Sequence, residues 1–282
     1  MTSVYDHIAE ARRRLEHAGL SAANAAVDAD VLAREALGWD RARLVTDGRG
    51  AAPPGFDERF SAFVDRRATR EPVAYIVGHR EFWGLDLEVT HDVLVPRPET
   101  EMIVEAVCEE IATRARVHSI VDVGTGSGCL SVALSQEFPT ARIVALDLSA
   151  AALHVARRNA RKHGGERVAF VQASLLDAIA GPVDVIVSNP PYVPSGASVL
   201  PEVGRFEPAL ALYGGDDGLA LLRRLIAGAL VRLAAGGLFV VEFGFGQDTP
   251  VLELAYSAGW QDITIKEDLQ GIPRVAVMRK LQ

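Results

Sequence analysis

The chain has 282 residues, of which 49% are hydrophobic and 23% charged, a composition typical of a globular protein with one large domain or two smaller ones. No apolar stretch approaches the roughly 20 residues that span a bilayer, and the polar N-terminus is not typical of a signal peptide. The net charge is −8, and residues 1–75 contain 11 Arg, no Lys and 12 acidic residues. Neither part has the clustered positive charge that tight binding to nucleic acid needs, which favours a protein or small-molecule substrate.

The cysteine content points to a reducing compartment. Cys108 and Cys129 are the only cysteines, and neither has metal-ligand spacing to a histidine. We expect a buried, reduced thiol at each position, with no disulfide and no metal site. With the charge, this predicts a cytoplasmic protein that contacts no membrane and no nucleic acid directly. We also expect a monomer, although neither composition nor charge determines the oligomeric state.

Residues 1–75 are predicted to form a small helical domain. Apolar residues recur at helical spacing in residues 8–18, 24–37 and 56–68. The first two stretches end at Gly19 and Gly38, and glycine is the residue that most often follows the end of a helix.

From residue 73 the pattern changes to alternation with aromatic residues. Residues 81–89 predict a strand or hairpin, and residues 93–95 predict a further short strand. We interpret residues 76–96 as a linker hairpin between two domains. Phe82 and Trp83 within it are more typical of core packing than of substrate contact.

Residues 97–282 alternate between strand and helix patterns, which is typical of a mostly parallel sheet with helices on both faces. A first helix is expected from residues 96–101 through Ile111. Strands are predicted at residues 119–123, 142–146, 168–172, 183–188, 237–243, 262–266 and 274–279. Helices are predicted at residues 129–137, 150–163 and 219–233. The fold class is therefore α/β, a doubly wound seven-stranded sheet whose last two strands form an antiparallel hairpin.

A glycine loop follows the first predicted strand. Residues 124–128 are Gly-Thr-Gly-Ser-Gly, and glycines between a strand and a helix let the backbone turn tightly and approach a ligand. Asp147 ends the next strand, where its carboxylate can accept both hydroxyls of a ribose. The glycine spacing differs from that of a pyrophosphate-binding loop, so we expect a cofactor with a ribose but no phosphate, S-adenosylmethionine. The alternative is that the glycines only turn the chain and Asp147 only caps a helix.

The strand at residues 183–188 ends in Asn189, Pro190, Pro191 and Tyr192. Prolines cannot continue a helix or donate to a sheet, so they hold a rigid turn. Such a turn presents an amide oxygen, a backbone carbonyl and an aromatic face together. We predict that the Asn189 side-chain oxygen and the Pro190 carbonyl accept the two hydrogens of a planar NH₂ group, and that Tyr192 packs on its plane. The segment predicts a transferase acting on an amide or amino nitrogen; the alternative is a structural turn with a packed tyrosine.

With these residues, the chain resembles the class I S-adenosylmethionine-dependent methyltransferases that modify exocyclic or amide nitrogen. Three further segments resemble, more narrowly, the peptide chain release factor glutamine N5-methyltransferases (the HemK/PrmC family): Gly-His-Arg-Glu-Phe-Trp-Gly at 78–84, Pro-Arg-Pro-Glu-Thr-Glu at 96–101 and Arg-Phe-Glu-Pro-Ala-Leu at 205–210. The resemblance runs from the helical N-terminal part to the C-terminal hairpin. It implies methyl transfer from S-adenosylmethionine to the N5 amide nitrogen of the glutamine in the Gly-Gly-Gln loop of class 1 release factors.

The resemblance also implies three domains: a helical substrate-docking domain at 1–75, the linker hairpin at 76–96 and a Rossmann-like methyltransferase domain at 97–282. The implied catalytic residues are Asn189, Pro190, Pro191 and Tyr192. The implied cofactor-binding residues are Gly124, Thr125, Gly126, Ser127, Gly128, Asp147, Ser174, Leu175 and Asn189.

One position departs from the family pattern. Family members often have Asp after the third strand, where this chain has Ser174. We expect Ser174 to accept a hydrogen bond from the adenine amino group while Leu175 packs on the ring, with somewhat weaker cofactor affinity than a carboxylate would provide. Arg97, Glu99 and Glu101 suit helix capping as well as they suit an active-site role.

Three other functions compete with this one. A ribosomal-protein glutamine would require the same chemistry. A DNA or RNA adenine offers a similar planar NH₂ group, but that reading needs basic clusters beside the site, and residues 194–207 contain only Arg205. An adaptor that binds a translation factor without catalysis is disfavoured by the intact residues 189–192.

Overall fold

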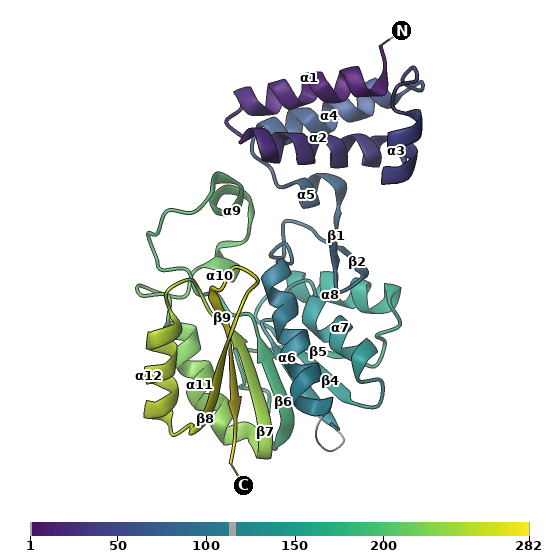
Figure 1. Ribbon diagram of the computed structural model, residues 1–282. Coiled ribbons are helices and arrows are strands. Elements are labelled where there is room, and N and C mark those ends of the chain that lie inside the picture. Colours follow the sequence, from purple (N-terminus) through teal and green to yellow (C-terminus); the bar gives the residue numbers. More distant parts are fainter. Residues whose placement is uncertain (1, 113–116, 282) are drawn as a thin grey trace. The chain divides into compact units, whose positions relative to one another are not determined.

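The computed structural model describes residues 2–112 and 117–281 (Figure 1). The chain forms two compact units, Met1–His79 with Val199–Phe206, and Arg80–Ser198 with Glu207–Gln282. We call them the helical unit and the sheet unit. None of the helices in the described residues combines the length and the apolar character needed to cross a membrane.

The helical unit is a bundle closed around one apolar core. Its first helix begins with a capping box, in which Ser3 Oγ accepts from the Asp6 backbone N–H and the Asp6 carboxylate accepts from that of Ser3. The core includes Leu15, Leu32 and Phe60, so the predicted helical periodicity marks the buried faces. The helices that precede the sheet unit in the chain are α1 (Val4–His17), α2 (Ala22–Leu37), α3 (Arg41–Asp47), α4 (Phe56–Ala68) and α5 (Val73–Val77).

Helix α5 corrects the sequence interpretation, which placed strand-like alternation from residue 73. Pro72 precedes this helix, and Gly78 ends it in a left-handed conformation with φ of +86°. Because Ala74, Tyr75 and Ile76 are all buried, five residues carry no helical periodicity that a sequence pattern could detect.

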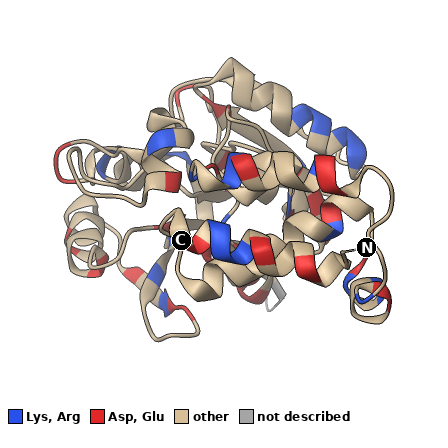
Figure 2. Ribbon diagram, turned by 90° about the horizontal axis from the view of Figure 1, so that it is seen from above, with Lys and Arg blue, Asp and Glu red and all other residues tan. Residues whose placement is uncertain are grey.

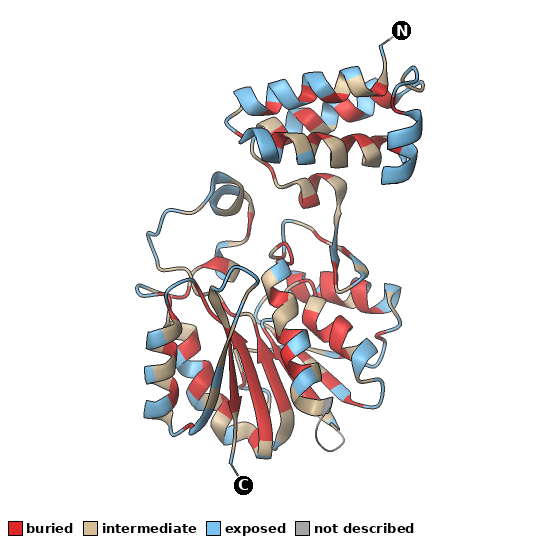
Figure 3. Ribbon diagram, in the orientation of Figure 1, coloured by how far each residue is buried: buried red, intermediate tan, exposed pale blue. Residues whose placement is uncertain are grey.

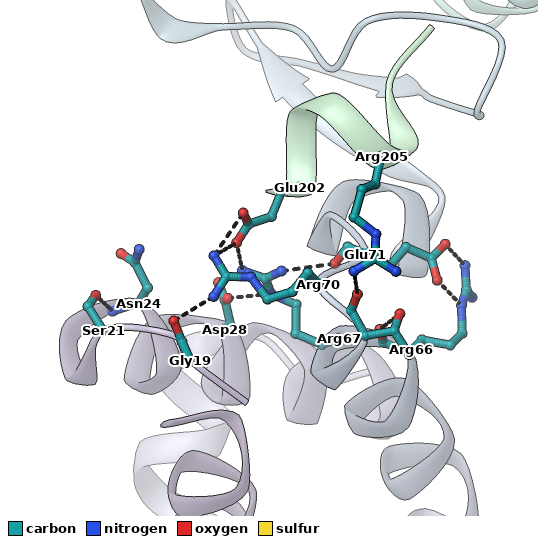
Figure 4. A network of polar contacts seen from close by, with 11 residues as sticks. Gly19, Ser21, Asn24, Asp28, Arg66, Arg67, Arg70, Glu71, Glu202 and Arg205 are labelled. Carbon is teal, nitrogen blue, oxygen red and sulfur yellow. Dashed lines mark hydrogen bonds and ion pairs between the residues drawn. The ribbon is translucent and has the colours of Figure 1, made fainter. Parts of the chain in front are cut away.

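Residues 199–206 belong to the helical unit although the chain on both sides of them belongs to the sheet unit. They contain α9 (Pro201–Phe206). Figure 4 shows how ion pairs hold them: Arg67, only 5% exposed, contacts Asp28 at 2.7 Å and Glu202 at 3.2 Å, and Arg70 contacts Glu202 at 2.7 Å. The Arg205 guanidinium also donates to the Thr69 carbonyl at 3.3 Å.

The sheet unit begins with a hairpin and continues as the predicted α/β sheet. The strand order is β5-β4-β3-β6-β7-β9-β8; neighbours from β5 to β7 are parallel, and β9 is antiparallel to both β7 and β8. This confirms the mostly parallel seven-stranded sheet with a C-terminal antiparallel hairpin. The hairpin consists of β1 (His79–Phe82) and β2 (Leu85–Glu88), which form a two-stranded sheet of their own. The seven strands of the large sheet are β3 (Ser119–Val123), β4 (Arg142–Asp147), β5 (Ala169–Gln172), β6 (Val183–Ser188), β7 (Leu233–Glu242), β8 (Asp262–Glu267) and β9 (Pro273–Arg279).

The sheet is buried on both faces, as Figure 3 shows for its central strands. Neighbouring residues of one strand enter different cores: Ile120 packs in one and Val121 in the other. Helices α6 and α7 cover the first core, and α11 and α12 cover the second. The helical elements of this unit are η1 (Pro98–Thr100), α6 (Glu101–Ala112), α7 (Cys129–Glu137), α8 (Ala150–Lys162), α10 (Ala209–Leu212), α11 (Ala220–Arg232) and α12 (Asp248–Ala258).

Two local expectations were wrong. Residues 93–95 are not a strand; Val93 and Val95 are buried in irregular chain, which explains their apolar character. Cys108 and Cys129 are reduced but only partly buried. Besides α5, helices α3, α9, α10 and α12 were not predicted.

Candidate active site

A pocket of about 260 Å³ lies in the sheet unit at the carboxyl ends of β3, β4 and β6, the edge where open parallel sheets bind ligands. Most of the predicted site residues line it together: Gly124, Thr125, Gly126, Ser127, Asp147, Ser174, Leu175, Asn189 and Pro191. Gly128, Pro190 and Tyr192 are not among the lining residues.

The glycine loop is fastened to the neighbouring strand. The backbone N–H groups of Gly124 and Thr125 both donate to the Leu146 carbonyl, at 2.8 and 2.9 Å. Gly124 and Gly126 have left-handed φ values of +74° and +55°, and a Cβ at either position would meet no protein atom within 4 Å. Because both glycines line the pocket, the open space beside their backbone is available to a ligand.

The buried Asp122 carboxylate is hydrogen-bonded to the glycine loop and to the helix that follows it. Its Oδ2 accepts from the Thr125 hydroxyl at 2.6 Å and from the Ser131 N–H at 3.1 Å, while its Oδ1 has no hydrogen-bond partner among the described residues. Complete burial raises the pKa of this carboxyl to about 7 against the effect of the two hydrogen bonds.

Asp147 lies where β4 ends and lines the pocket. Its Oδ2 accepts from the Gly126 N–H at 2.9 Å, and its Oδ1 accepts from the Ser149 N–H at 2.8 Å. Burial raises its pKa although these backbone donors favour the charged form. Asp147 therefore fixes the loop to the start of the next helix, and each of its oxygens keeps a lone pair for a ligand.

Leu175 is one of three described non-glycine residues with a left-handed backbone, with φ of +46°. It follows β5, lines the pocket beside Ser174 and packs against the second core. A residue with a side chain is strained in this conformation, so the pocket wall at Leu175 carries a local cost in free energy.

The Asn189 turn is supported by groups outside the predicted set. Asn189 Nδ2 donates to Thr100 Oγ1 at 2.8 Å, and Thr100 Oγ1 donates to Glu242 Oε2 at 2.7 Å. The Tyr192 hydroxyl donates to Glu242 Oε1 at 3.0 Å, and the Tyr192 carbonyl accepts from the Gln247 side chain at 3.0 Å. Burial, followed by the charge of Glu242, raises the pKa of Tyr192, so its hydroxyl remains a donor.

Sequence reasoning missed Thr100, Glu242 and Glu207. Glu207 is buried, and this burial raises the pKa of its carboxyl. The carboxylate accepts a hydrogen bond from the Arg97 guanidinium at 2.6 Å, so Arg97 at the pocket wall has a fixed partner. A signal for Glu242 was present, because a single acidic residue ended the apolar strand pattern at residues 237–243. Thr100 and Glu207 each lie in a segment that carried the family resemblance.

The charge of the pocket wall is balanced. Its charged residues are Asp92, Arg97, Asp147 and Arg224. Basic and acidic residues also share several helices in the view of Figure 2. This arrangement differs from the basic groove that nucleic-acid binding favours.

Two family models match the chain. The PrmC N-terminal domain matches residues 6–78, and the methyltransferase small domain matches residues 99–204. The second match includes the glycine loop, Asp147 and residues 189–192.

The fold is shared with solved methyltransferase structures. A methyltransferase from Pyrococcus furiosus superposes with a TM-score of 0.53 and 19% identity, covering 71% of this chain and 90% of that one. The catalytic domain of human METTL16 superposes with a TM-score of 0.58 and 18% identity, covering 76% and 81%. At these identities, the likeness concerns the fold alone.

Curated relatives match most of the chain. A release factor glutamine methyltransferase from Xylella fastidiosa is 42% identical, covering 90% of this chain and 92% of the relative. One from Burkholderia pseudomallei is 40% identical with 89% and 90% covered, and one from Bradyrhizobium diazoefficiens is 42% identical with 96% and 95% covered. The glycine-loop pocket, the Asn189 turn and these matches together show that the chain belongs to the release factor glutamine methyltransferase family.

Proposed function

We propose that this chain methylates the N5 amide nitrogen of the glutamine in the Gly-Gly-Gln loop of class 1 peptide chain release factors, with S-adenosylmethionine as the methyl donor. The observation that carries the proposal is that Asn189 and Pro191 line the same pocket as the glycine loop and Asp147. The proposal includes the helical residues 1–75 as the docking domain and a monomer in the cytoplasm, where release factors act.

The pocket suits the proposed donor. The open space beside Gly124 and Gly126 allows close approach of a ligand to the backbone, and Asp147 keeps acceptor capacity for ribose hydroxyls. Ala173 and Leu175 provide apolar wall for a purine, and Ser174 offers a hydroxyl beside it. When bound, S-adenosylmethionine supplies an electrophilic methyl group on a positively charged sulfur.

The residues of this chain then hold and orient the amide. A carboxamide nitrogen is a weak nucleophile because its lone pair is delocalised into the carbonyl. In the proposed complex, the Asn189 oxygen and the Pro190 carbonyl accept the two N–H groups, which fixes the nitrogen in one direction and favours electron density on it. As the N–C bond forms, the methyl–sulfur bond would break and leave a neutral thioether, and the nitrogen would lose one proton to water. These residues therefore act by positioning and electrostatics.

Labelled methyl transfer tests the proposal. Purified release factor, ribosomal protein and an adenine-containing oligonucleotide are offered side by side with the full chain and labelled donor, and the modified residue is identified. We expect label on the release factor only, and none after its loop glutamine is changed to Ala. Label that persists on that variant, or that goes to ribosomal protein or nucleic acid instead, would overturn the assignment.

Asn189→Ala tests the site itself. Because one oriented hydrogen-bonding group of this kind contributes about 10²–10³-fold to a rate, we expect the turnover number to fall by that factor. Asp217→Asn, which changes an exposed ion pair with Arg223, is the matched control and should retain the parent rate. Undiminished turnover by Asn189→Ala would rule out the role given to Asn189.

A further inference from the structure

Glu242 is a buried carboxylate to which the proposed reaction gives no direct role. It ends β7 after an apolar run and is 2% exposed. Its two oxygens have different partners: Oε2 accepts from the Thr100 hydroxyl at 2.7 Å, and Oε1 accepts from the Tyr192 hydroxyl at 3.0 Å. Thr100 is hydrogen-bonded to Asn189, and Tyr192 follows Asn189 by three residues in the same turn.

The chemistry of these groups sets the direction of every hydrogen bond. An ionised carboxylate only accepts, so Thr100 and Tyr192 each direct their single hydroxyl proton to Glu242. The Thr100 oxygen is then left with lone pairs alone. It can accept from an N–H but cannot donate to an oxygen, and it accepts from Asn189 Nδ2 at 2.8 Å. The flipped amide would place the Asn189 oxygen against an oxygen with no proton to give.

We propose that Glu242 and Thr100 are positioning residues that set the orientation of the Asn189 amide, so that its oxygen is the group left for the substrate. The proposal rests on the proposed function, because a carboxamide substrate offers N–H donors that only an acceptor can bind. If the Asn189 amide were flipped, its NH₂ group would face the NH₂ group of the substrate, and neither could accept a hydrogen bond from the other.

Protonation of Glu242 removes this constraint. A protonated carboxyl can donate to Thr100, which then donates its own proton onward and favours the flipped amide. Burial raises the pKa of Glu242 to about 7, and the hydrogen bonds from Thr100 and Tyr192 oppose that rise. The charged groups that act on it are Glu99, which raises its pKa further, and Arg274, which lowers it.

The other titratable groups around this site have separate partners or effects. Arg97 favours the charged form of Tyr192 and is itself paired with Glu207. Burial raises the pKa of Cys129 to about 12, so its thiol carries no charge in the relevant range. Burial also raises the pKa of Asp122 to about 7, but its carboxyl is hydrogen-bonded to Thr125 in the glycine loop and to Ser131 in the helix that follows it. Glu242 is therefore the group whose ionisation changes the donors that reach Asn189 near neutral pH.

Methyl transfer measured against pH in the full chain is the first test. The parent should lose turnover as the pH falls through about 7, while Thr100→Ser, which keeps the hydroxyl, stays within about threefold of it. Thr100→Val keeps the side-chain shape without the hydroxyl, and Glu242→Gln can either donate or accept. Both should lose about tenfold or more in turnover number, with the dissociation constant of the methyl donor little changed, and Glu242→Gln should lose the acid limb.

A second test needs neither substrate nor turnover. In ¹⁵N-labelled protein, the Asn189 side-chain NH₂ signal, assigned by its loss in Asn189→Asp, should shift with a midpoint near pH 7. The shift should persist in Thr100→Ser and disappear in Glu242→Gln. The proposal would be overturned if Thr100→Val kept the parent turnover number. It would also be overturned if the Asn189 NH₂ signal still shifted with pH in Glu242→Gln. A titrating signal in a protein that methylates no release factor would leave the orientation standing and remove the proposed function.

Discussion

Gly126 has two features that favour glycine, a left-handed backbone and a position at the pocket wall. Its φ of +55° lies in the left-handed region, and a Cβ there would enter the open space of the pocket without meeting protein. Gly38 at the end of α2 has a similar φ of +64° and equally open space, but it lies in the helical unit. Comparing substitutions at Gly126 and Gly38 therefore separates the free-energy cost of a left-handed backbone from the effect of filling the pocket.

We therefore predict that Gly126→Ala and Gly38→Ala each lower the free energy of unfolding by about 1 kcal/mol, because alanine in this conformation is strained. Only Gly126→Ala should weaken binding of the methyl donor, by about tenfold or more, because its methyl group takes ligand space. Urea unfolding and titration calorimetry measure the two effects. Equal donor affinity in both variants would mean that the ligand does not approach the loop at Gly126.

Ser174 gives a prediction in the opposite direction. It lines the pocket beside Leu175, where many relatives are expected to have a carboxylate. Because a charged acceptor binds an amino group more strongly than a hydroxyl does, Ser174→Asp should tighten donor binding by about fivefold, equivalent to roughly 1 kcal/mol. Ser174→Ala, which has no acceptor, should weaken it. Calorimetry that finds one affinity for all three proteins would end the proposed contact with adenine.

Helix α9 shows how a single element can belong to a unit remote in sequence. Its one turn and a half buries no residue completely, so apolar packing contributes little to its position. Glu202, however, forms ion pairs with both Arg67 and Arg70. Burial alone would raise the pKa of its carboxyl, but the hydrogen bonds from these arginines lower it below the usual value. We infer that charge pairing within the helical unit is the main interaction that holds this segment.

Glu202→Gln should accordingly loosen residues 199–206. A neutral amide keeps a hydrogen bond but loses the charge, while Arg67 retains its pair with Asp28, so the helical unit itself stays folded. We expect deuterium exchange in peptides covering 199–206 to rise by about tenfold, with exchange in α1 unchanged. Asp217→Asn, at an exposed pair, is the control. Equal exchange in Glu202→Gln and the parent would show that other contacts hold α9.

At the scale of the whole molecule, local patterns predicted the sheet better than its outlying parts. Strands β3 and β6 have the predicted bounds because a buried parallel strand is a short apolar run with clear ends. Strand β7 was predicted at residues 237–243 but begins four residues earlier, at Leu233, so Gly236 and Gly237 lie inside the strand. Its pairing with β6 shifts register there, and the strand continues through the irregularity.

The site was predictable where one segment carries the chemistry and not where distant segments meet. The glycine loop and Asn189 are local motifs, so their residues could be named from the sequence. The Thr100–Glu242 hydrogen bond joins positions 142 residues apart, and the Arg67–Glu202 pair joins positions 135 apart. Neither spacing has a periodic signature, since such contacts depend on the assembled fold.

Two buried carboxyls also make the stability of the folded chain depend on pH. Burial raises the pKa of Asp122 and of Glu242 to about 7, whereas both titrate near pH 4 in an unfolded chain. Between these values, the folded state holds protons that the unfolded state has released. The free energy of unfolding therefore falls as the pH rises from about 4 to 7, by up to about 1.4 kcal/mol per pH unit for each group.

Asp122→Asn and Glu242→Gln each remove one such group while keeping its shape. Relative to the parent, each variant should gain stability steadily as the pH rises from 5 to 7, and the difference should level off above pH 7, where the parent carboxyl is already ionised. Urea unfolding at intervals across pH 5–8 measures this difference, and subtraction cancels the other acids of the chain. If the Glu242→Gln curve ran parallel to that of the parent, Glu242 would titrate alike in both states, and the acid limb expected for turnover would have to come from another group.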